Sequence, residues 1–229
     1  MILLRQFCAV IPAVLLSIVW LQGNNAACGA PAYKALRYDE DYSYLREPGA
    51  RSDIWDPLKF IRLDLQSGSY LTLGGEIRQR YEYHRNARWV QGAQDDNGYL
   101  LQRYMLHADV HLGAGFRIFA QTRGAYESGR NGGPRATDED QLDLTQAFFD
   151  VAWRPAEEAT FTVRVGRQEV GLGSSRLVSF RESPNLRRSF EGVRGIIERG
   201  GVRIDLLALE VVEVRDGTFN DRADSGQRL

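Results

Sequence analysis

The stretch from Leu100 to Arg123, LLQRYMLHADVHLGAGFRIFAQTR, decides the fold class of this chain. Apolar residues recur at every second position on both sides of the turn at 113–115, and ionisable residues take many of the positions between them. Alternation with period two predicts a β-strand with two different faces, and a short glycine-containing turn joins two such strands into a hairpin. The sequence therefore predicts an antiparallel hairpin with one apolar face and one charged face.

The same alternation occurs in five further segments. In the first of them, one face carries Leu71, Leu73, Gly75, Ile77, Tyr81 and Tyr83, and the other carries Thr72, Glu76, Arg78, Arg80, Glu82 and His84. The remaining runs lie near residues 147–153, 161–165, 193–197 and 202–208. Together with the hairpin they make seven predicted strands.

The connections between these strands alternate in length. The long ones span residues 86–98, 127–140 and 170–190, and the short ones span 113–115, 154–159 and 200–201. Transmembrane β-barrels have short periplasmic turns and longer outer loops. A soluble β-sandwich with one solvated face is the alternative, but it rarely keeps this asymmetry so regular. We therefore predict an all-β chain that folds as an antiparallel transmembrane β-barrel of the outer-membrane type.

Seven strands are too few for a finished barrel. Bacterial barrels of this kind have an even number of strands, with eight as the usual minimum. An open edge would also expose unpaired backbone groups to lipid. We expect this chain either to be the N-terminal part of a longer barrel or to assemble with other chains.

The first 27 residues predict a secretory signal peptide, because Arg5 precedes an apolar run at 7–21 and two alanines follow that run. The run is shorter than the roughly 20 residues of a transmembrane helix, which is one alternative. Acylation of Cys28 is another, although Asn25 stands where an aliphatic residue is expected. The predicted organisation is a signal peptide at 1–27, an irregular segment at 28–69 and a partial barrel at 70–229.

Arginine dominates the basic residues, with 27 arginines among the 29 and only Lys34 and Lys59 as lysines. Codon bias is one explanation of the total. The distribution is also uneven, because residues 166–203 hold eight arginines against four glutamates in a chain of formal net charge −1. A guanidinium is a planar fork that binds carboxylates bidentately. The arginine-rich segment therefore predicts binding of carboxylates or phosphates.

The sequence contains no GxSxG motif, no phosphate-cradling loop and no paired-cysteine zinc pattern. Nucleic-acid binding is disfavoured because the mature chain is near neutral and predicted to be exported. His107, Asp109 and His111 share one face of a strand, but positions i and i+4 lie roughly 13 Å apart, and we interpret the set as a charged wall that pairs with Arg103. We interpret Glu76 and its charged neighbours on the same strand as members of cross-strand ion pairs. We expect no metal, no cofactor, no catalytic residue and no nucleic-acid partner.

Five blocks of the chain, in order, resemble the alginate-export family of bacterial outer-membrane β-barrel porins. They are WDPLKFIRL at 55–63, YLTLGGEIRQRYE at 70–82, LLQRYMLHADVHL at 100–112, DEDQLDLTQAFFDVAW at 138–153 and VGRQEVGLGSSRLVSFRESPNLRRSFEGVR at 165–194. The resemblance implies an eighteen-stranded barrel in the outer membrane of a Gram-negative bacterium, surrounded by lipid and inserted by the barrel-assembly machinery.

The resemblance also implies a passive, anion-selective channel for an anionic polysaccharide such as alginate, or for sugar acids. Carried over by motif, the candidate substrate-binding arginines of the lumen are Arg78, Arg103, Arg167, Arg181 and Arg188. Two alternatives remain open. The chain is a non-conducting barrel fragment, or it is an envelope enzyme that acts on acidic polysaccharide through Tyr104 or His107 with an arginine beside it.

Overall fold

The computed structural model describes residues 32–229 except 86–88, 90, 92–95 and 157–158. The predicted signal peptide and Cys28 lie outside the described residues. Within the described residues, no helix combines the length and the hydropathy that a membrane-spanning helix needs.

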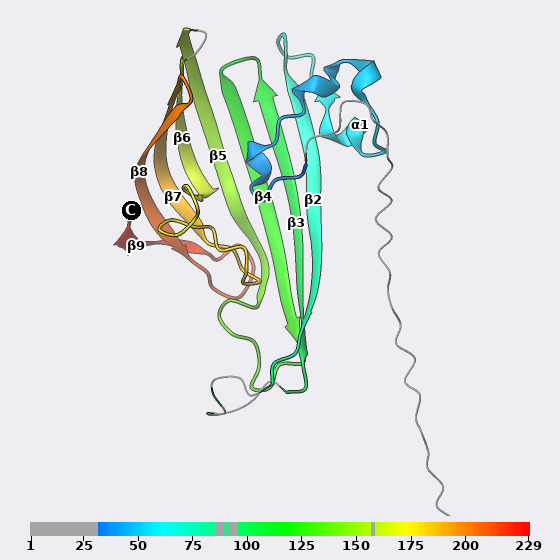
Figure 1. Ribbon diagram of the computed structural model, residues 1–229, viewed down its shortest axis with the longest axis vertical. Helices are drawn as coiled ribbons and strands as arrows, with labels where there is room; N and C mark the ends of the chain where they lie inside the picture. The colour runs from blue at the N-terminus through cyan, green and yellow to red at the C-terminus, as the bar shows by residue number, and fades with distance from the viewer. Residues whose placement is uncertain (1–31, 86–88, 90, 92–95, 157–158) are drawn as a thin grey trace, which may run out of the picture. The chain divides into compact units, whose positions relative to one another are not determined.

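The described chain forms a single antiparallel sheet in which each strand pairs with its neighbours in sequence (Figure 1). The strands are β1 (Ile61–Arg62), β2 (Tyr70–Glu82), β3 (Tyr99–Leu112), β4 (Phe116–Ser128), β5 (Asp140–Ala156), β6 (Ala159–Glu169), β7 (Ser189–Arg199), β8 (Val202–Glu213) and β9 (Arg222–Arg228). β1 and β9 lie at the two edges, so the sheet is open rather than closed into a barrel.

The predicted all-β antiparallel architecture is confirmed, but the count of seven strands is wrong, because the sheet has nine. The additional strands are the two-residue β1 and the polar β9. β9 carries no alternating apolar pattern and most of its residues are exposed. Its pairing with β8 uses backbone groups, which every non-proline residue has, so hydrophobic periodicity could not reveal it.

The two faces of the sheet differ as the alternation predicted. On β2 and β3, Ile77 is 75% exposed and Leu106 is 70% exposed, whereas Arg103 is 0% exposed and Asp109 is 3% exposed. The apolar face continues across the sheet with the exposed side chains Phe116, Ile118, Phe149, Trp153, Val163, Val193, Ile204 and Leu206. The face that carries the ionisable side chains is the buried one. We call it the polar face.

Two segments cover the polar face, as Figure 1 shows. The first is residues 32–60, which contain the 3-10 helices η1 (Arg37–Asp39), η2 (Ser43–Arg46) and η3 (Pro48–Ala50) and the short helix α1 (Asp56–Lys59). The second is the β6–β7 loop, residues 170–188. Tyr38 of η1 packs edge-on against Phe148 with ring centroids 5.4 Å apart, in a cluster with Leu36 and Phe119. Aromatic packing therefore fixes the N-terminal segment to the sheet.

A β-bulge changes the phase of β5 at its start. Arg123 and Ala125 of β4 are two residues apart, but their partners Asp143 and Asp140 are three residues apart. The extra residue lets Asp140 and Asp143 both turn into the buried side, while the two residues between them stay exposed. The β8–β9 connection, residues 214–221, lies beside this bulge through a parallel bridge between Leu142 and Thr218.

Candidate functional site

Three arginines of the polar face converge on one carboxylate, that of Glu182 in the β6–β7 loop. Arg103 Nη2 of β3 lies 2.6 Å from Glu182 Oε1, and Arg78 Nη1 of β2 lies 3.3 Å from the same oxygen. Arg187, at the end of the loop, pairs with the other oxygen, Oε2. We call Arg78, Arg103 and Arg187 the arginine cluster. The sheet thus holds a carboxylate between guanidinium groups from three places in the chain.

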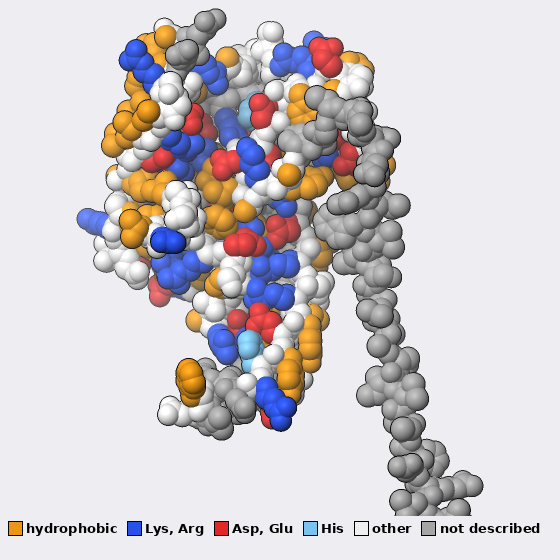
Figure 2. All heavy atoms as spheres, viewed as in Figure 1, with side chains coloured by type: hydrophobic (Ala, Val, Ile, Leu, Met, Phe, Trp, Pro, Cys, Tyr) orange, Lys and Arg blue, Asp and Glu red, His pale blue; other side chains and the backbone are white. Residues whose placement is uncertain are grey.

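A second carboxylate, that of Glu76 on β2, also pairs with arginines of the cluster. Its Oε1 lies 2.6 Å from Arg103 Nη2, and its Oε2 lies 3.6 Å from Arg187 and 3.3 Å from Arg37 in the N-terminal segment. Arg103 is fully buried, and a buried charge is tolerated only when it is paired and hydrogen-bonded. Glu76 and Glu182 supply that pairing from opposite sides. Figure 2 shows basic and acidic side chains interspersed over this face.

Hydrogen bonds to the backbone hold the β6–β7 loop against the sheet. Arg78 Nη2 donates to the Pro184 carbonyl at 2.8 Å. Asn185 Nδ2 donates to the Gln102 carbonyl at 2.9 Å and to the Asp138 carbonyl at 2.8 Å. Asn185 is fully buried, so these bonds satisfy an amide that water does not reach. The position of Glu182 therefore follows from a loop that is anchored to the sheet by the residues just after it.

Arg181 and Arg188 form a different arrangement, which we call the open arginine pair. Both line a cavity of about 230 Å³ between the β6–β7 loop and β8. Burial, together with the neighbouring Arg181 guanidinium, lowers the pKa of Arg188. Among the described residues, neither arginine forms an ion pair with an acidic side chain. The acidic Glu213 and Asp224 also line the cavity, but Glu213 pairs with Arg215 and Asp224 accepts a hydrogen bond from Gln227.

Arg167 lies apart from both groups. Along β6 it shares its phase with the exposed Phe161 and Val163 rather than with the buried Arg164. Its Nη2 lies 3.0 Å from Glu191 Oε2, and its Nη1 donates to the Leu144 carbonyl at 3.1 Å. The five predicted arginines therefore divide into three places. Arg78 and Arg103 meet at Glu182, Arg181 and Arg188 share the cavity, and Arg167 joins neither.

The interpretation of Glu76 as a member of a cross-strand ion pair is confirmed by its pairing with Arg103. The sequence analysis missed the other residues that complete the site, namely Arg187, Glu182 and Arg37. Arg187 and Arg188 are adjacent, and nothing in the sequence separates the paired one from the open one. The interpretation that Asp109 pairs with Arg103 is also wrong. Asp109 Oδ1 accepts a hydrogen bond from Arg117 Nε at 2.8 Å. Arg117 follows the tight β3–β4 turn and faces His111 in register, which places it nearer.

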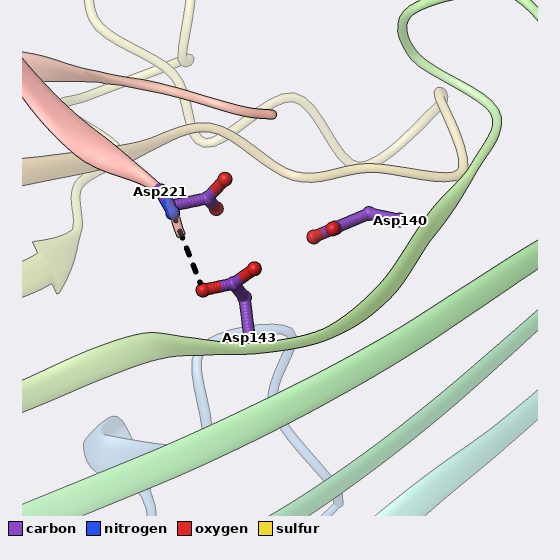
Figure 3. A group of neighbouring side chains, drawn as sticks. All are labelled: Asp140, Asp143 and Asp221. Carbon is purple, nitrogen blue, oxygen red and sulfur yellow. Dashed lines mark hydrogen bonds between the residues drawn. The ribbon is translucent and has the colours of Figure 1, made fainter. Parts of the chain in front are cut away.

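A third group of charged residues lies where the bulge of β5 meets the β8–β9 connection. Asp140, Asp143 and Asp221 each present one carboxylate oxygen within 4.8 Å of the others, and all three residues are buried. Figure 3 shows their carboxyl groups pointing toward one another. Burial, followed by the nearby Asp140 and Asp143, raises the pKa of Asp221 to about 6. We call these residues the aspartate cluster.

An antiparallel sheet with one apolar face and one arginine-rich face is the arrangement of a strand-built membrane wall that surrounds a polar lumen. The alginate export family matches residues 69–229, which is more than half of the chain, and the chain belongs to this family. It is a family of outer-membrane transport porins and not of enzymes. No curated protein and no solved structure matches the chain.

Tyr104 and His107, the two residues named for the enzyme alternative, lie on opposite faces of β3. Tyr104 is 38% exposed and its hydroxyl contacts Gln79 and Gln102, whereas His107 is buried on the other face of β3. Strand alternation separates the two side chains. No described contact joins either of them to the arginine cluster.

Proposed function

We propose that this protein is a passive, anion-selective outer-membrane channel for anionic polysaccharides of the alginate type or for sugar acids. The observation that carries the proposal is the arginine cluster, because Arg78, Arg103 and Arg187 already bind a carboxylate, that of Glu182. A uronate residue of a polysaccharide presents the same chemical group. The polar face then lines the lumen, and the exposed apolar face meets lipid.

The size of the strands supports the placement in a membrane. β2 to β8 have 11 to 17 residues, and a tilted strand needs about 9 to 11 residues to cross a bilayer. The open edges at β1 and β9 would leave backbone groups unpaired in lipid, at a cost of several kcal/mol each. We therefore propose that the nine strands are one part of the wall of a larger closed barrel.

Glu182 also suggests how a polyanion passes without becoming trapped. A channel must bind its substrate well enough to admit it and weakly enough to release it. When a substrate carboxylate replaces Glu182 at the arginine cluster, one charge-assisted set of hydrogen bonds replaces another. The net free energy of this exchange is small, so bound uronates leave readily. The open arginine pair, which has no carboxylate to displace, attracts the polyanion first.

Planar-bilayer recordings test the proposal. The closed barrel that contains these nine strands is reconstituted, and the reversal potential in a salt gradient gives the ratio of anion to cation permeability. We expect an anion preference and a current block by uronate oligomers, with neutral oligosaccharides of the same length as the control. Cation preference together with indifference to uronate oligomers contradicts the proposal. Absence of any conductance favours the alternative of a non-conducting fragment.

A further inference from the structure

The aspartate cluster carries more negative charge than its surroundings balance. Among the described residues, Arg123 supplies its only ion pairs, at 2.7 Å to Asp140 Oδ2 and 3.9 Å to Asp221 Oδ2. Three carboxylates and one guanidinium leave a formal charge of −2. Asp140 is 0% exposed, Asp143 is 1% exposed and Asp221 is 9% exposed. Uncompensated charge in a buried site is costly, so the three carboxylates favour a further positive charge beside them.

Two oxygens of the cluster have no hydrogen-bond donor, which is a separate indication of a ligand. Asp140 Oδ1 and Asp143 Oδ2 are both buried and unpartnered. The other oxygens of these two groups are engaged, because Asp140 Oδ2 pairs with Arg123 and Asp143 Oδ1 accepts a bond from the Asp221 backbone N–H at 3.5 Å. Buried carboxylate oxygens are normally satisfied. Figure 3 shows the three carboxyl groups pointing toward one another across a shared space.

We propose that Asp140, Asp143 and Asp221 bind one divalent cation of the Ca²⁺ class. Ca²⁺ takes oxygen ligands at about 2.3–2.6 Å, so two ligands on opposite sides of the ion are about 4.6–5.2 Å apart. The three oxygens lie within 4.8 Å of one another, so one ion of this size can reach all of them. Arg123 holds Asp140 Oδ2 and leaves Oδ1 for the ion. Mg²⁺ is a poorer match because it is smaller and keeps several of its waters.

The cation joins two parts of the chain that are far apart in sequence. Asp140 and Asp143 belong to β5, whereas Asp221 ends the β8–β9 connection. The connection is already attached to β5, since the Leu142 N–H donates to the Gly217 carbonyl at 3.1 Å and the Phe219 N–H donates to the Leu142 carbonyl at 2.9 Å. A bound cation reinforces this bridge and stabilises the position of β9. This inference does not depend on the proposed transport function.

Calorimetric titration of the purified full chain with CaCl₂, after treatment with a chelator, tests the site. Wild-type protein is expected to bind one Ca²⁺ per chain. In Asp143→Asn and Asp221→Asn we expect affinity to fall by about tenfold or more, because each change removes a ligand charge. Asp64→Asn is the matched control, since Asp64 is exposed and distant in sequence. Absence of Ca²⁺ binding by the wild type, or equal binding by Asp143→Asn, overturns the proposal.

Hydrogen exchange on the unaltered protein provides a test that does not depend on the folding of a variant. The backbone amides of Leu142 and Phe219 form the bridge beside the cluster. We expect Ca²⁺ to slow their exchange relative to chelator-treated protein, and Mg²⁺ to slow it less. Amides of β2, such as that of Ile77, serve as an internal control and are expected not to change. Equal exchange at Leu142 and Phe219 with and without Ca²⁺ overturns the proposal.

Discussion

Arg187 and Arg188 are neighbours in the chain, yet they belong to two regions with opposite electrostatic states. Arg187 is 2% exposed and pairs with Glu182, Glu169 and Glu76. Arg188 lines the cavity with Arg181 and has no acidic partner among the described residues. Residue type and local sequence are the same. The difference teaches that a count of arginines overstates the positive charge available to a substrate.

The two regions also differ in what a mutation is expected to cost. Removing one partner of a buried ion pair leaves the other charge uncompensated, and this typically costs about 3–5 kcal/mol. Removing an arginine that pairs with no carboxylate leaves no uncompensated charge behind. If the proposed function holds, we expect the arginine cluster to contribute both to the fold and to substrate binding, and the open arginine pair to contribute to substrate binding alone. Substitutions in each region can separate these contributions.

The largest effect is expected from Arg103→Met in the arginine cluster. The substitution removes one of the two guanidinium groups that Glu76 and Glu182 share, and Arg187 supplies the other. We expect the free energy of unfolding to fall by about 3–5 kcal/mol, measured by urea unfolding in detergent micelles and followed by tryptophan fluorescence. Arg176→Met is the control, because Arg176 is exposed in the same loop, and its effect should stay within about 0.5 kcal/mol. Equal stabilities of the two variants would show that Arg103 is not a structural charge.

Glu182→Gln tests the exchange of carboxylates at the arginine cluster. The glutamine keeps the size of the side chain but no longer competes with a substrate carboxylate for the guanidinium groups. We expect uronate oligomers to block the channel at roughly tenfold lower concentration, since a hydrogen bond to a charged group contributes about 1.5 kcal/mol or more. Glu191→Gln is the matched control, because its side chain is 44% exposed against 43% for Glu182 and pairs with Arg167 instead. An unchanged blocking concentration in Glu182→Gln would contradict the exchange.

Hydrophobic alternation was sufficient to predict the two faces of the sheet, because period two is imposed by strand geometry. The alternation failed to predict the segments in which the strand departs from period two. The bulge of β5 turns Asp140 and Asp143 to the same side although they are three residues apart. β9 has no apolar period at all.

For the candidate site, the sequence predicted the residue type and the face of two arginines, but not the carboxylate that they bind. The alternation placed Arg78 and Arg103 on the polar face, but their partner Glu182 comes from a loop whose path depends on anchors such as Asn185. Those anchors are long-range hydrogen bonds, and no local pattern encodes them. Because local sequence does not encode such long-range contacts, it predicted Arg188 as a substrate-binding arginine and did not predict Arg187.

The double substitution Arg181→Gln with Arg188→Gln is expected to change selectivity without changing stability. Neither side chain balances a described carboxylate, so the free energy of unfolding should stay within about 0.5 kcal/mol per site. The ratio of anion to cation permeability should fall, because the guanidinium charges at the cavity are lost. Reversal potentials in planar bilayers measure the ratio, with Arg176→Gln as the control for loss of a loop charge elsewhere. A loss of stability comparable to that of Arg103→Met would show that the open arginine pair is structural as well.

The smallest effect is expected from acid, at the ion pairs of the N-terminal segment. The hydrogen bond from Lys59 lowers the pKa of Asp53. Burial acts to raise the pKa of Asp56, but backbone N–H bonds from Asp53 and Ser52 together with Lys59 outweigh it and lower this pKa as well. Both carboxyl groups therefore have a pKa below the ordinary value of an aspartate in the folded chain.

The sign of the pH dependence follows from these lowered pKa values. Above about pH 4 the folded and unfolded chains both carry the carboxylates, and the stabilisation by Lys59 is fully present. As the pH falls through the folded-state values, the carboxyl groups are protonated and the stabilisation is lost. We expect the fluorescence of Trp55, which lies beside α1, to report release of the segment below about pH 4. Lys59→Met should already have lost the stabilisation at neutral pH and should flatten this transition. An equally steep transition in Lys59→Met would mean that other carboxylates hold the segment in place.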